Sequence, residues 1–274
     1  MNRMDTKLQP VNVLCLKWGD RYPAFYVNRL YAAVRRNMRR PFRFVCITDN
    51  AEGIDPGIDC VPFPEDPGVI GRPWPNIFIK LCLFKRGFAD LKGPTLFLDV
   101  DVLVLRELDK FFDYRPGDFC IIHNWVERRK MIFRKLPFIG NSSCFRFDAG
   151  SDQANRVYEI FLRDKEKGLT DEYNWLFRSG SQKFQTRAMA EAGTVTWWPD
   201  AWVSSFKRQC IPPFPLNLLM TPRYPKTASV VAFHGRPDIT EAIVGFRGQT
   251  RGGEPGFHLS CRPTPWARAE WERI

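Results

Sequence analysis

Residues 95–105 read TLFLDVDVLVL, an apolar run that only Asp99 and Asp101 interrupt. Such a run is typical of a strand that is covered on both faces. Side chains alternate between the faces of a strand, so the two aspartates point the same way if the strand stays extended. Two neighbouring carboxylates in apolar surroundings repel and lose hydration, and a divalent cation between them removes both penalties. We interpret this stretch as a metal site; the alternative is a pair of solvated aspartates that mark a turn.

The segments on either side alternate between strand and helix patterns. Before this stretch we expect strands at 11–17, 42–48 and 58–63 and helices at 23–40 and 76–88. From residue 102 onward we expect strands at 102–105, 118–123, 142–147, 195–198 and 228–233 and helices at 151–167, 170–177 and 183–192. The alternation predicts a single α/β domain with a mostly parallel mixed sheet flanked by helices. We place this domain at 1–244 and expect a Gly- and Arg-rich loop and tail, 245–274, to pack on it.

The composition excludes several classes of protein. The chain has 274 residues, 44% of them hydrophobic, which excludes intrinsic disorder and a minimal scaffold that needs staples. Its 41 basic and 30 acidic residues give a net charge of +11, which favours anionic partners. The eight cysteines lack the paired spacing of a zinc site. Neither a secretory signal nor an apolar run of about 18 residues is visible, so we expect a cytoplasmic protein with reduced thiols.

Two further residues make the metal interpretation more specific. His234 ends another apolar strand pattern, and an imidazole added to two carboxylates shifts the expected ion from magnesium towards manganese. Lys80 lies on the predicted helix that leads into the 95–105 strand. Taken alone, His234 is more simply a hydrogen-bonded structural residue, and Lys80 a solvated helical lysine.

Four short segments occur in an order that resembles a known family. They are KL at 80–81, LFLDVDVLV at 96–104, NS at 141–142 and FHG at 233–235. These segments are similar to the ordered motifs of glycogenin-like, family-8-type glycosyltransferases, which include bacterial lipopolysaccharide hexosyltransferases. The resemblance covers roughly residues 11–240 and implies the Rossmann-like GT-A fold.

The resemblance implies an enzyme that moves a hexose from a nucleotide-diphosphate sugar, above all a UDP-sugar, to an acceptor hydroxyl. It implies that Asp99, Asp101 and His234 hold Mn²⁺, with Mg²⁺ as the alternative ion. The donor-binding residues that it implies are Lys17, Trp18, Lys80, Asp99, Val100, Asp101, Asn141, Ser142, Gly235 and Arg236. The implied catalytic residue is Gln182.

The chain departs from the family pattern at two places. Where the family has an Asp-Gln pair this chain reads Ser181-Gln182, so only the glutamine carries over, and Asp171 is a candidate replacement for the aspartate. The Lys-Pro-Trp segment that follows the family histidine reads Arg236-Pro237-Asp238 here. A catalytically weak or inactive relative that binds a nucleotide sugar is therefore an alternative function.

Two basic clusters outside the predicted site bear on the chemical identity of the acceptor, which the motifs do not determine. One contains Arg35, Arg36, Arg39 and Arg40, and the other contains Arg128, Arg129, Lys130, Arg134 and Lys135. Residues 127–135 mix Met, Ile and Phe with these charges, which favours an anionic or lipid-linked acceptor and peripheral contact at the inner face of a membrane. A binding protein for anionic polymers is another alternative, and solvated surface is the simplest interpretation of both clusters. Nucleic acid is disfavoured as a partner.

A sugar-1-phosphate nucleotidyltransferase is disfavoured too. That chemistry favours a Gly-rich phosphate-binding loop after the first strand, and residues 17–22 contain a single glycine.

Overall fold

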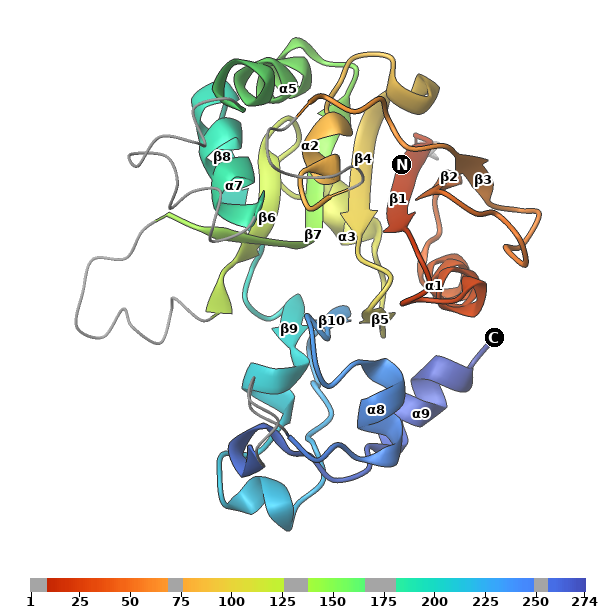
Figure 1. The fold of residues 1–274 in the computed structure, drawn as a ribbon, viewed down its shortest axis with the longest axis vertical. Coiled ribbons are helices and arrows are strands. Elements are labelled where there is room, and N and C mark those ends of the chain that lie inside the picture. The colour runs from red at the N-terminus through yellow and green to blue at the C-terminus, as the bar shows by residue number, and fades with distance from the viewer. Residues whose placement is uncertain (1–8, 69–75, 126–137, 166–180, 249–255) are drawn as a thin grey trace, which may run out of the picture.

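The computed structural model describes residues 9–68, 76–125, 138–165, 181–248 and 256–274 (Figure 1). Its main feature is a seven-stranded sheet of order β3-β2-β1-β4-β7-β6-β8. The strands are β1 (Val11–Lys17), β2 (Phe42–Thr48), β3 (Asp59–Val61), β4 (Gly93–Leu98), β6 (Phe119–His123), β7 (Gly140–Ala149) and β8 (Val195–Trp197). Within this sheet β7 runs antiparallel to β4 and β6, whereas the other neighbouring pairs are parallel. The predicted mostly parallel mixed sheet is confirmed.

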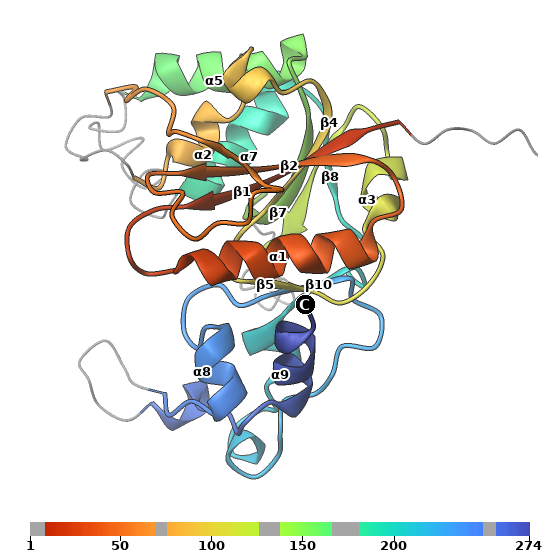
Figure 2. The same ribbon diagram turned by 90° about the vertical axis from the view of Figure 1, so that its right-hand side faces the viewer.

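The central strands are buried on both faces, and their side chains alternate between two hydrophobic cores. Leu96 and Leu98 of β4 belong to one core, and Phe97 belongs to the other. Among the helices that flank the main sheet, α1 (Ala24–Asn37) and α3 (Asp109–Asp113) contribute to the first core. The helices α2 (Ile79–Cys82), α5 (Asp152–Asp164) and α7 (Ser181–Ala192) contribute to the second. Figure 2 shows α1 on one side of the sheet and α2, α5 and α7 on the other. This two-sided burial explains why the strands read as continuous apolar runs.

Beyond β4 the chain leaves the main sheet. β4 ends at Leu98, the chain turns at residues 100–101, and β5 (Val102–Val104) pairs with β10 (Val230–Ala232). β10 also pairs with β9 (Val203–Ser205), so these strands form a second, three-stranded sheet. The condition that the strand stays extended through Asp99 and Asp101 is not met, because the two residues lie at the turn between the sheets. The prediction also missed β9.

The second sheet leads into a smaller lobe that contains α8 (Ile239–Val244) and α9 (Pro265–Glu272) (Figure 1). The lobe also contains three short turns, Phe206–Cys210, Leu216–Leu218 and Phe257–Leu259. Trp271 of α9 packs against Tyr26 of α1 with ring centroids 4.8 Å apart, so the end of the chain contacts the main domain. In the part of the chain that the structure describes, no helix combines the length and the apolar character needed to cross a bilayer.

Two predicted helices are shorter than expected. The helix expected at 76–88 is reduced to α2, and Gly87, with φ +76°, separates it from a single turn at Phe88–Asp90. The helix expected at 23–40 ends at Asn37, before Pro41 and β2. The helix predicted at 170–177, with Asp171, lies outside the described residues, as does the basic cluster at 128–135.

A buried ion pair fixes the connection between α1 and β2. The Asp109 carboxylate accepts hydrogen bonds from the backbone amides of Arg39 (2.9 Å) and Arg40 (3.2 Å) and from Nε of Arg40 (2.9 Å). Burial alone would raise the pKa of Asp109, but these hydrogen bonds and the Arg40 charge hold it below its ordinary value. The folded protein therefore favours the ionised carboxylate, which stabilises the fold above the pKa of Asp109 in the unfolded chain. That contribution is lost as the pH falls through the folded-state pKa.

We predict that Asp109→Asn lowers the free energy of unfolding at neutral pH by about 3 kcal/mol, because it leaves the buried Arg40 guanidinium short of a charge partner. Stability should also depend less on pH in the acidic range. Asp113→Asn is the matched control, since Asp113 also pairs with Arg40 but its side chain is 66% exposed. It should cost less than about 1 kcal/mol. Urea titrations at several pH values measure both effects, and equal losses in the two variants would contradict the prediction.

Candidate functional site

A cavity of about 660 Å³ lies at the edge of the main sheet where β1 and β4 end. Ligands of α/β sheets bind at this carboxyl edge. β7 runs the opposite way, so it contributes its first residues there instead of its last. The predicted site residues that line the cavity are Trp18, Lys80, Asp99, Val100, Asp101, Asn141, Ser142, Gln182, His234 and Gly235. These residues come from six separate segments of the chain.

Backbone hydrogen bonds position the two aspartates. The amide of Asp99 donates to the carbonyl of Ser143 (2.9 Å), which attaches the end of β4 to the start of β7. The carbonyl of Asp101 accepts from the amide of Phe233 (3.1 Å), directly before His234. The turn at the two carboxylates is therefore held to both sheets, and the same contacts bring His234 to the cavity.

Lys80 provides the charge that the two carboxylates need in this structure. Its Nζ lies 2.6 Å from Oδ1 of Asp99 and donates to the carbonyl of Ser142 at 3.2 Å. It also lies 4.7 Å from the ring centroid of Phe97. The side chain of Lys80 is only 13% exposed, so water screens the pair weakly. The solvated helical lysine considered above does not describe this residue.

Asp101 is the more deeply buried of the two carboxylates. Burial, followed by the charge of Asp99, raises its pKa to about 6, although Lys80 and the Tyr22 hydroxyl counteract the shift. The Tyr22 hydroxyl donates to Oδ2 of Asp101 at 3.2 Å. The site thus holds two carboxylates at some electrostatic cost, and positive charge in the cavity relieves that cost.

His234 is a neutral imidazole in this environment. Burial, with smaller contributions from the charges of Lys207 and Arg208, lowers its pKa to about 4. Its Nε2 lies 2.7 Å from Oγ of Ser205, and the Trp125 ring stacks on it with centroids 5.3 Å apart. A neutral imidazole is the form that can bind a metal ion.

The donor types of Asp99, Asp101 and His234 fit a divalent ion of the manganese class, and all three residues line one cavity. The three side chains lie farther apart than the ligands of an occupied metal site. Among the described residues, no three His, Cys, Asp or Glu side chains are grouped closely enough to hold a metal. Lys80 and Tyr22 hold the carboxylates where a metal would bind. An ion would therefore need additional ligands from a bound molecule and a small movement of Lys80.

The start of α7 lies beside the start of β7. Thr186 Oγ1 accepts from the amide of Gly140 (2.8 Å) and donates to the carbonyl of Gln182 (2.7 Å). A β-carbon at Gly140 would lie 2.9 Å from this hydroxyl and 2.7 Å from Ile121, so a larger residue there would require both side chains to shift. The contact places Ser181 and Gln182 in the cavity with Asn141.

Two predicted donor-binding residues do not line the cavity. Lys17 is the last residue of β1 and is buried. Arg236 is exposed and pairs with Glu241, and its guanidinium lies 5.0 Å from the ring centroid of Phe246. The family resemblance implied both as donor-binding residues, and their neighbours along the chain, Trp18 and Gly235, do line the cavity.

Several residues that surround the cavity were missed. Arg21, Tyr22, Asn124, Trp125 and Ser143 line it, and Lys207 lies next to it. Arg21 and Tyr22 follow β1 at the carboxyl edge, so the sequence did contain a signal for them. Lys207 gave no signal, because it reaches the site from the turn after β9. A β-carbon added to Gly235 would lie 3.1 Å from Nζ of Lys207, which places the ammonium of Lys207 next to Gly235.

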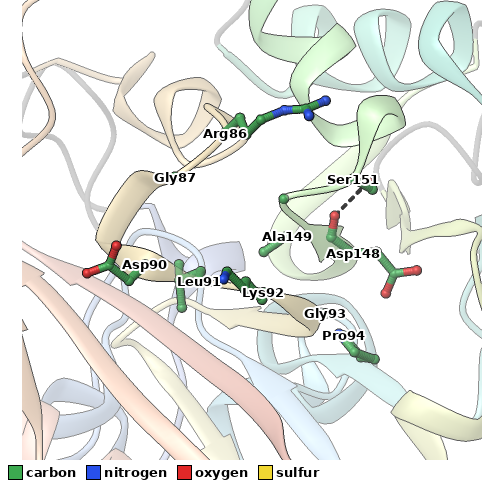
Figure 3. Close-up of a pocket in the computed structure, with 11 residues that line it drawn as sticks. Arg86, Gly87, Asp90, Leu91, Lys92, Gly93, Pro94, Asp148, Ala149 and Ser151 are labelled. Atoms are coloured by element: carbon green, nitrogen blue, oxygen red, sulfur yellow. Dashed lines mark hydrogen bonds between the residues drawn. The ribbon is translucent and has the colours of Figure 1, made fainter.

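A second cavity of about 610 Å³ lies at the opposite end of β4 (Figure 3). Arg86, Lys92 and Asp148 are among its lining residues, and Ser151 Oγ donates to the carbonyl of Asp148 at 2.7 Å. Ser151 also caps α5 by accepting from the amide of Ala154. These polar contacts are internal to the fold, and the site predicted from sequence lies at the other edge of the sheet.

Known structures resemble this chain, although neither a protein-family model nor the sequence of a curated protein matches it. The apo structure of the bifunctional glycosyltransferase WbbM aligns with this chain with a TM-score of 0.58 and 11% sequence identity. The alignment covers 100% of this chain and 53% of the WbbM chain. This chain therefore spans about half the length of WbbM. The galactosyltransferase LgtC, in complex with donor and acceptor sugar analogs, has a TM-score of 0.54 and 15% identity, over 83% of this chain and 88% of its own. These likenesses confirm the predicted GT-A fold.

We predict that Lys80→Met increases the affinity of the protein for Mn²⁺ alone by about tenfold, because it removes the ammonium that competes for Asp99. The measurement is the rise in melting temperature over a MnCl₂ series, since an ion that binds only the folded state stabilises it. The matched control is Lys85→Met, because Lys85 is exposed and reaches only Glu65, at 4.0 Å. The competition between Lys80 and the ion is disproved if Lys80→Met and the wild type respond equally.

Proposed function

We propose that the protein is a metal-dependent glycosyltransferase that moves a hexose from a nucleotide-diphosphate sugar, a UDP-sugar in the first instance, to an acceptor hydroxyl. The observation that carries the proposal is the cavity at the carboxyl edge of a GT-A sheet, which two carboxylates and a neutral imidazole line together. The GT-A fold alone does not assign an activity. The donor types and the surrounding cations agree with binding of a diphosphate and a metal ion.

Within this proposal Asp99, Asp101 and His234 hold Mn²⁺ or Mg²⁺, which supplies positive charge to the diphosphate leaving group. Lys80 adds a second positive charge on the same side of the cavity. Tyr22 orients Asp101 through its hydroxyl, and Trp125 holds the His234 ring by stacking. Trp18 offers an indole that is 37% exposed, against which a nucleotide base can stack.

The residues around the donor sugar come from β7 and α7. Asn141 and Ser142 present amide and hydroxyl groups, and Gln182 presents an amide beside them. We propose that Gln182 contacts the sugar near the reacting carbon. Ser181 stands in the cavity where the family pattern has aspartate, and its hydroxyl does not replace a carboxylate. The serine at this position favours the alternative function, which is a nucleotide-sugar-binding protein with weak or no transfer activity.

We assign the second diphosphate contact to Lys207, in place of Arg236. The ammonium of Lys207 lies beside Gly235, and its charge influences His234. Burial lowers the pKa of Lys207, and the nearby Arg208 charge lowers it further. An anion beside this ammonium relieves both effects. Arg236 is already neutralised by Glu241.

The acceptor is the least constrained part of the proposal. The net charge of +11 favours an anionic or lipid-linked molecule, and few of the positive charges lie in the cavity. A location at the inner face of a membrane agrees with such an acceptor. The acceptor is therefore best sought by a screen that starts from phosphate-bearing and lipid-linked sugars.

We predict that Asp99→Asn and Asp101→Asn each lower the release of UDP from a UDP-sugar by about 100-fold or more, because each removes a ligand of the ion that stabilises the leaving group. Calorimetry should show loss of Mn²⁺-dependent UDP binding in both variants. Asp148→Asn, in the second cavity, is the control and should behave as the wild type. A wild type that binds UDP with Mn²⁺ but releases none from any UDP-sugar would establish the binding alternative. Unchanged UDP binding in both variants would overturn the metal assignment.

We also predict that Lys207→Ala weakens UDP binding by about tenfold, equivalent to about 1.4 kcal/mol, because it removes a charge beside the diphosphate position. Arg236→Ala should change UDP binding by less than about twofold, since solvent screens an exposed charge that is already paired. The two variants are measured side by side by calorimetry at one Mn²⁺ concentration. The reverse order of effects would restore Arg236 as the contact.

A further inference from the structure

A compact loop at the end of the smaller lobe has an unusual distribution of side chains. Residues 211–222 read IPPFPLNLLMTP and contain no charged residue. The loop is closed at its base, where the amide of Arg223 donates to the carbonyl of Cys210 at 2.8 Å. Inside the loop, the amides of Leu219 (3.1 Å) and Met220 (2.8 Å) both donate to the carbonyl of Leu216. The loop is therefore an ordered structure with a defined outer surface.

Asn217 of this loop points inward, whereas its large apolar side chains Phe214, Leu216, Leu218, Leu219 and Met220 are exposed. Asn217 is fully buried, and its Nδ2 donates to the carbonyls of Phe257 (2.8 Å) and Ser260 (2.9 Å). Leu219 is 76% exposed and Phe214 is 57% exposed. The exposed apolar surface, which we call the apolar tip, consists of Phe214, Leu216, Leu218, Leu219, Met220 and Phe257. Single exposed leucines are ordinary in soluble proteins, but a contiguous cluster of this kind marks an interaction surface.

The charged residues that flank the 211–222 loop within residues 201–237 are all basic. Residues 201–237 contain no aspartate or glutamate. The same stretch contains Arg208, Arg223 and Lys226, which are exposed, and the adjoining turn is followed by exposed Arg262. In Figure 1 this loop lies at the lower end of the molecule, away from the seven-stranded sheet. An apolar tip with a basic surround is complementary to a layer whose interior is apolar and whose surface is negative.

We propose that the apolar tip inserts into the surface of a bilayer that contains anionic phospholipids, with the surrounding basic residues at the level of the headgroups. A second copy of this chain fits less well, because a symmetric contact through this face brings the same basic residues of two molecules together. The proposal deepens the membrane location in the proposed function and rests on it, but it concerns a different surface, since none of the residues of the tip lines the cavity at Asp99. It supplies a place of action for an enzyme whose acceptor is attached to lipid.

The test is flotation of the full chain with vesicles of phosphatidylcholine alone or mixed with phosphatidylglycerol. The wild type should float with the mixed vesicles and much less with pure phosphatidylcholine. Leu219→Glu should lower the bound fraction by about tenfold, because it places a charge at the inserted position. Arg223→Gln should lower binding by a smaller factor and reduce its sensitivity to salt. Leu162→Glu is the matched control: Leu162 is an exposed leucine on α5, and this variant should bind as the wild type does.

Two outcomes overturn the proposal. In one, Leu219→Glu floats as well as the wild type; in the other, the wild type binds neither kind of vesicle. In the second case, a dimer in gel filtration that Leu219→Glu disperses would assign the tip to self-association. Calorimetry of Mn²⁺ and UDP on the same variants keeps the two proposals distinguishable, because the tip variants should retain nucleotide binding. Unaltered nucleotide binding also shows that the variants are folded.

Discussion

Two carboxylates that repel each other in a poorly hydrated place determine how this site is organised. Asp99 and Asp101 lie at the point where the chain passes from the main sheet to the second one, and each is attached by its backbone to a different sheet. The neighbouring groups are arranged accordingly: an ammonium pairs with one carboxylate, a phenol hydroxyl with the other, and the nearby imidazole is neutral. The same turn that creates the repulsion also starts β5, and β5 pairs with β10, the strand that precedes His234. The geometry of the cavity therefore depends on the turn and on the pairing of the second sheet.

The part of the fold that was predictable from sequence is the part with a strong and regular pattern. Central strands such as β1 and β2 are apolar on both faces and were expected at their true bounds, and the buried residues of α1 recur at helical spacing, so its presence was expected although its end was not. The second sheet was not fully expected. Each of its strands has three residues, and β9 gains its identity only from pairing with β10. The sequence left open whether a turn lies at Asp99 and Asp101, because apolar residues continue on both sides of it and resemble one long strand.

The candidate site shows the same division between local and distant information. Asp99 and His234 were found because each follows an apolar strand and lies in a recognisable short motif. Lys207 and Trp125 reach the cavity from segments whose sequences carry no chemical pattern. Arg236 illustrates the opposite error, since proximity along the chain to Gly235 did not bring its guanidinium into the cavity. Only tertiary structure shows which cation lies beside the cavity and which is neutralised by a neighbouring carboxylate.

The reversed direction of β7 has a consequence for how the specificity of such a protein can diverge. The chain leaves the cavity at Trp125 and returns to it at Asn141, so the connection between β6 and β7 begins and ends at the wall of the site. The connection after β7, at Gly150 and Ser151, adjoins the second cavity at the opposite edge (Figure 3). Exchange of the first connection between related proteins would therefore change the wall of the cavity and leave the paired strands untouched. Exchange of the second would alter a remote surface and leave the chemistry as it is.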